Sequence, residues 1–65
     1  MRNTPYSVII QCEGRNSIVG ETTYRLTQAH KRFRYESQIN DGRVVDIVTA
    51  QGIIIESNKP ERIMR

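Results

Sequence analysis

The sequence has little of what usually holds a very small protein together. It has one cysteine and no tryptophan, and aromatic residues make up only 6% of its 65 residues. Cys12 cannot close an intrachain disulfide, and Cys12 with His30 cannot form a structural zinc site. The apolar core must therefore stabilise the fold by itself, near the lower limit of chain length. We expect one domain spanning 1–65, with flexible ends at 1–4 and 59–65.

Long apolar runs are also missing. The run that follows Pro5 is too short for a signal peptide or a membrane-spanning helix. One free cysteine fits a reducing compartment. We therefore expect a cytoplasmic protein that does not contact a membrane.

No arrangement typical of an active site is present. The four glycines are scattered rather than gathered in a phosphate-binding motif, and the acidic residues show neither paired-carboxylate nor calcium-loop spacing. We interpret His30 as a packing residue and Cys12 as a small apolar residue. The sequence predicts no enzymatic activity, no metal or cofactor, and no small-molecule substrate.

Three segments rich in β-branched and aromatic residues are predicted strands, at residues 6–12, 43–49 and 53–56. Turn-forming residues follow the first strand at 13–16, and residues 17–19 allow a short additional strand that would end at Gly20. Pro60 has no N–H to donate, so it ends regular pairing after the last strand.

A helix is predicted between Thr22 and Ser37, a stretch without glycine or proline. Residues at the spacing i, i+3, i+4 and i+7 place an apolar side on this helix: Leu26, Ala29, His30 and Phe33. Thr22 or Thr23 is the predicted N-cap, and Arg32 and Glu36, four residues apart, support the helix.

The end of this helix has two interpretations. In the first, residues 33–39 form a strand, because they alternate like one and lead into the turn residues Asn40-Asp41-Gly42. The helix would then end near Lys31. We favour the longer helix to Ser37, with the same three residues as its stop, because glycine accepts the left-handed backbone that ends helices.

Together these elements predict an α+β fold. It consists of a small, mostly antiparallel sheet of three strands, with a short fourth if residues 17–19 pair, and one helix packed on one face. The order along the chain is strand, optional short strand, helix, strand, strand.

The strands carry branched apolar residues on both faces, although one helix can cover only one face. The second face needs another cover, such as a symmetric partner, a larger protein or the C-terminal segment. We therefore expect a non-catalytic interaction or regulatory module that forms a homodimer or docks on a larger protein through its sheet. The candidate contact residues are Ile9, Val44, Val48 and Ile54.

Positive charge is concentrated in the predicted helix. The whole chain has ten basic and seven acidic residues, a net charge of +3, whereas residues 22–35 contain basic residues and no acidic one. Cations with interleaved tyrosines are typical of nucleic-acid binding, because cations meet phosphates and rings stack on bases. Nucleic-acid binding is therefore the alternative function. Its candidate contacts are Tyr24, Arg25, Lys31, Arg32, Arg34 and Tyr35.

Overall fold

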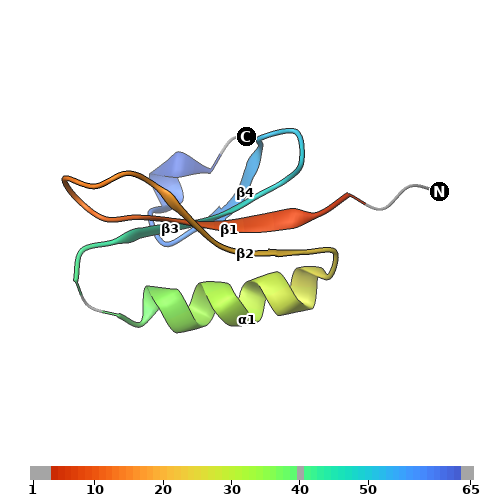
Figure 1. The fold of residues 1–65 in the computed structure, drawn as a ribbon, viewed down its shortest axis with the longest axis horizontal. Helices are drawn as coiled ribbons and strands as arrows, with labels where there is room; N and C mark the ends of the chain where they lie inside the picture. The colour runs from red at the N-terminus through yellow and green to blue at the C-terminus, as the bar shows by residue number, and fades with distance from the viewer. Residues whose placement is uncertain (1–3, 40, 64–65) are drawn as a thin grey trace.

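The computed structural model describes residues 4–39 and 41–63. These residues form β1 (Tyr6–Gln11), β2 (Ile18–Thr23), α1 (Leu26–Ser37), β3 (Val44–Val48), β4 (Ile54–Ser57) and a short 3₁₀ turn, η1 (Pro60–Arg62). The strands make one antiparallel sheet in the order β2-β1-β3-β4. α1 packs on β1, β2 and β3 from one side of the sheet (Figure 1). The predicted α+β class is confirmed.

Strand β2 differs in length from the strand predicted at residues 17–19. It continues through Gly20 to Thr23, because Thr22 and Thr23 pair with β1, and β-branched residues favour strands. The helix consequently begins at Leu26, with Arg25 as its N-cap residue. The prediction of Thr22 or Thr23 as the N-cap was wrong. Thr23 instead accepts a hydrogen bond from the Arg25 N–H through its hydroxyl.

The longer of the two helix interpretations is confirmed, since α1 ends at Ser37. The N–H of Gln38 donates to carbonyl oxygens of the last turn, which closes the helix. Gly42 has a φ of 81° in the loop that follows, a backbone conformation that suits glycine. Asn40, the first residue of the predicted stop, lies outside the described residues.

The apolar core lies between α1 and the two central strands. Val8 and Ile10 of β1 face Ile47 and Val45 of β3 as direct cross-strand neighbours, and all four side chains are buried. Ala29 of α1 is buried against them, and its small side chain lets the helix approach the sheet. Tyr6 and Phe33 pack against this cluster at its margins. Alternate residues of β1 and β3 therefore form the core.

The C-terminal segment lies on the other side of the sheet. Figure 1 shows η1 above the sheet and α1 below it. The Arg62 guanidinium donates to the buried Asp46 carboxylate of β3 at 3.1 to 3.3 Å. This ion pair ties part of the predicted flexible end, 59–65, to the sheet. Residues 64–65 of that end, and residues 1–3 of the other, are outside the described ranges.

Candidate functional site

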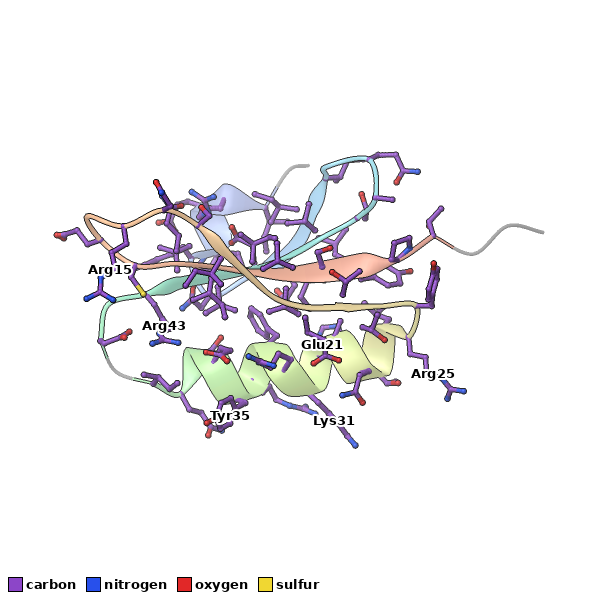
Figure 2. All side chains as sticks on the ribbon, viewed as in Figure 1. Arg15, Glu21, Arg25, Lys31, Tyr35 and Arg43 are labelled. Atoms are coloured by element: carbon purple, nitrogen blue, oxygen red, sulfur yellow. The ribbon has the colours of Figure 1, made fainter. Side chains whose placement is uncertain are left out.

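The side of α1 that points away from the sheet is basic and aromatic. Lys31, Arg34 and Tyr35 are exposed and stand at i, i+3 and i+4, so they share one stripe. In Figure 2, Lys31 and Tyr35 project from α1 away from the sheet, and Arg25 projects from the start of the helix. Tyr24, just before the helix, is 64% exposed. We call Lys31, Arg34 and Tyr35, together with the exposed Arg25 and Tyr24 at the start of the helix, the outer face of α1.

Arg32 is the one predicted nucleic-acid contact that does not join the outer face. Its Nε donates to Glu36 Oε2 at 2.7 Å, and its Nη1 lies 3.9 Å from Glu21 Oε1 of β2. In Figure 2, Glu21 lies between β2 and α1. The charge of Arg32 is thus matched by carboxylates on the inner side of the helix.

Acidic residues are kept away from the outer face. Residues 22–35 contain none, and Glu36, the one acid within α1, is buried toward the sheet with only 4% of its surface exposed. The charges of Arg25, Lys31 and Arg34 therefore add without a neighbouring carboxylate on the same side. Such a surface attracts polyanions and raises their rate of encounter.

Glu36 is the centre of an ion-pair network at the end of the helix. Its Oε1 accepts a hydrogen bond from Arg43 Nη1 at 2.6 Å, while Arg32 binds its other oxygen. Arg43 also donates through Nε and Nη2 to both oxygens of Asp41, at 2.9 and 2.7 Å. These bonds fasten the loop between α1 and β3 to the helix. The Asp41 contact raises the pKa of Arg43.

The Asp41 contact predicts a pH dependence of stability. Hydrogen bonds from the Arg43 side chain lower the pKa of Asp41 from 3.8 to about 2. Since the folded-state pKa is the lower one, this stabilisation is fully present above pH 3.8 and is lost as the pH falls toward 2. We expect urea midpoints of Asp41→Asn to fall less between pH 4 and 2 than those of the wild type. The same fall of the urea midpoint in the wild type and in Asp41→Asn between pH 4 and 2 would contradict this prediction.

The residues interpreted as structural lie near the core or at the end of the sheet. His30 is half-buried and packs edge-to-face against Phe33, with ring centroids 6.3 Å apart. Cys12 is half-buried beside a shallow hollow formed by the β1–β2 and α1–β3 loops. Among residues 4–39 and 41–63, no group of three His, Cys, Asp or Glu side chains is placed to hold a metal ion.

No known protein family, curated protein or solved structure matches this chain. In the described part of the chain, no helix has the length and apolar character needed to cross a bilayer.

The four predicted protein contacts share one surface. Ile9 lies between the core residues of β1, and Val44 and Val48 stand on either side of the three central residues of β3, so all three face away from α1. Ile54 pairs with Val48 and faces the same way. Each of them is half-buried. We call them the second sheet face.

The most exposed branched residues of the strands are elsewhere. Ile18 and Val19 begin β2 and are 57% and 59% exposed. The sequence pattern does not single them out, since it does not reveal that β2 is an outer strand of the sheet. Strand order alone makes these two residues a candidate contact surface.

Proposed function

We propose that this chain is a non-catalytic, cytoplasmic binding module that contacts single-stranded nucleic acid through the outer face of α1. The observation that carries the proposal is the outer face of α1, which has three exposed cations, two exposed tyrosines and no acidic residue. Arg25, Lys31 and Arg34 are free to meet phosphates, and Tyr24 and Tyr35 are 64% and 63% exposed.

The cations and the tyrosines of the outer face would contact different parts of the nucleic acid. Phosphate contacts supply affinity without sequence preference and weaken with salt, because binding releases condensed counterions. A tyrosine ring needs an unstacked base, which a single strand offers at low cost and a duplex does not. The stretch from residue 25 to residue 34 spans about 14 Å of helix, so one chain contacts only a few nucleotides.

A matched pair of lysine variants tests this proposal. Lys31 is on the outer face, whereas Lys59 is an exposed lysine before η1, on a different part of the surface. We expect Lys31→Gln to weaken single-strand binding and to reduce the slope of log affinity against log salt by about 0.7, one lost phosphate contact. Lys59→Gln should leave the slope unchanged. The measurement is fluorescence anisotropy with labelled single- and double-stranded oligonucleotides at low and near-physiological salt.

Two results would count against nucleic-acid binding. One is the same slope for the wild type and Lys31→Gln. The other is equal affinity for single strands and duplexes, which removes the role given to the tyrosines. The first result leaves the outer face as a solvated surface of the helix, and the second leaves it as a phosphate-binding surface on which no base stacks.

The second candidate function is protein association through the second sheet face. It is favoured by the four half-buried branched residues on the side that α1 leaves uncovered. Arg62, the last residue of η1, lies on the same side and binds Asp46, so it competes with a partner for part of this area. A lysine at Val48 is expected to prevent such association, since a charge there would be buried by the partner.

A further inference from the structure

The outer edge of β2 is an open strand edge. In the order β2-β1-β3-β4, β2 pairs only with β1, so the backbone groups on its other side have no strand beside them in the described part of the chain. Ile18 and Val19 are exposed at this edge. We propose that β2 pairs antiparallel with β2 of a second copy, about a two-fold axis, and joins two sheets into one of eight strands.

The faces of β2 allow one register over its full length. Pairing with β1 puts Ile18 and Thr23 on the α1 side, opposite Ile10 and Tyr6, and puts Val19 and Thr22 on the other side. Residues directly opposite in an antiparallel pair point to the same face. A two-fold axis between Gly20 and Glu21 meets this condition. The resulting pairs are Ile18 with Thr23 and Val19 with Thr22 of the second copy.

The irregular part of β2 lies at the axis. The register with β1 shifts at Gly20, which adds one residue to β2 relative to its neighbour. A bulge disturbs pairing locally and leaves the strand on either side intact. The two regular ends of β2 would therefore pair on both sides of the axis, where the branched residues are.

Exposed apolar groups meet in this arrangement. Ile18 of one copy would lie opposite Thr23 of the other, and Val19 opposite Thr22, and both Ile18 and Val19 have more than half of their surface exposed in the single chain. The two-fold axis repeats this contact. Two clusters of exposed apolar surface are thus removed from water by one pairing.

Charge at the edge is compatible with self-pairing. Glu21 of β2 lies 3.9 Å from Arg32 of α1. The axis brings two Glu21 carboxylates together, and the guanidinium beside each of them reduces their mutual repulsion. A strand pair of six residues buries little area, so the dimer should form and dissociate with concentration.

The symmetry places both helices on the same side. A two-fold axis perpendicular to an antiparallel sheet keeps each face of the sheet on its own side. Two outer faces of α1 would then point in one direction. This consequence, unlike the pairing itself, rests on the proposed nucleic-acid function: a strand long enough to reach both helices binds the dimer with avidity.

Sedimentation equilibrium without nucleic acid tests the pairing. We expect the wild-type mass to rise from one chain toward two over a hundredfold range of concentration. Val19→Lys should remain at one chain throughout. Ile53→Lys, a similar change at an exposed residue before β4, is the matched control and should dimerise like the wild type. Circular dichroism checks that each variant is folded.

An independent NMR measurement does not need the variants to fold. In a mixture of differently labelled copies, magnetisation should transfer between Ile18 of one chain and Thr23 of the other. A wild-type mass of one chain at every concentration would overturn the proposal. Association abolished by Val48→Lys or Ile53→Lys but not by Val19→Lys would also overturn it. Fluorescence anisotropy with a short oligonucleotide, at a protein concentration where only single chains are present, tests nucleic-acid binding separately. A failure of the pairing can therefore be told apart from a failure of nucleic-acid binding.

Discussion

Replacing Ile47 by alanine is expected to lower the free energy of unfolding by about 3 kcal/mol, enough to unfold most of the protein. Ile47 is fully buried, sits opposite Val8 and faces the helix at Ala29. Its truncation removes apolar contacts and leaves a cavity that the rigid central strands cannot close. The loss is severe because so short a chain has little stability to spare.

The matched control for this substitution is Ile53→Ala. Ile53 is the same residue type but is 49% exposed before β4. We expect its free energy of unfolding to stay within about 0.5 kcal/mol of that of the wild type. Circular dichroism during urea denaturation measures both variants. Equal loss in the two would mean that the core does not lie between α1 and the central strands.

Replacing Glu36 by lysine is the second change with a large expected effect. The Glu36 carboxylate is buried and binds Arg32 and Arg43 at 2.7 and 2.6 Å. Lysine would place a third positive charge among the two guanidiniums and bury it without a partner. We expect a loss of about 4 kcal/mol, which leaves the chain unfolded at neutral pH.

Glu61→Lys makes the same change of charge at an exposed residue of η1. It should change the free energy of unfolding by no more than about 0.5 kcal/mol. Glu36→Gln, which keeps the shape and removes the charge, should fall between the two. If Glu36→Lys proved as stable as Glu61→Lys, the ion pairs of Glu36 with Arg32 and Arg43 would not contribute to the stability of the fold.

The sequence predicts the fold class because its strongest local signals agree with the tertiary structure. Ala29 and Phe33 of the predicted apolar side of the helix do pack on the sheet, whereas Leu26 of that side is 37% exposed. The helix boundary at its start was missed because Thr22 and Thr23 suit both a helix cap and a strand. Pairing with β1, a contact between distant residues, decides between the two.

The candidate sites are predicted less completely for a related reason. Arg32 has the same local signals as Lys31, and only the packing of α1 reveals that it faces Glu36 and Glu21. The contact between Asp46 and Arg62 spans sixteen residues and has no local signature. Ile18 and Val19 become notable only when the strand order is known. These are properties of the assembled molecule rather than of any one segment.

The separation of inner and outer sides on α1 also bears on how this surface can change. The inner side holds Ala29, Phe33 and Glu36, which secure the fold, whereas Lys31, Arg34 and Tyr35 project into solvent. Substitutions on the outer side are nearly neutral for stability. Selection, or a designer, can therefore alter what the helix recognises while the scaffold beneath it stays the same.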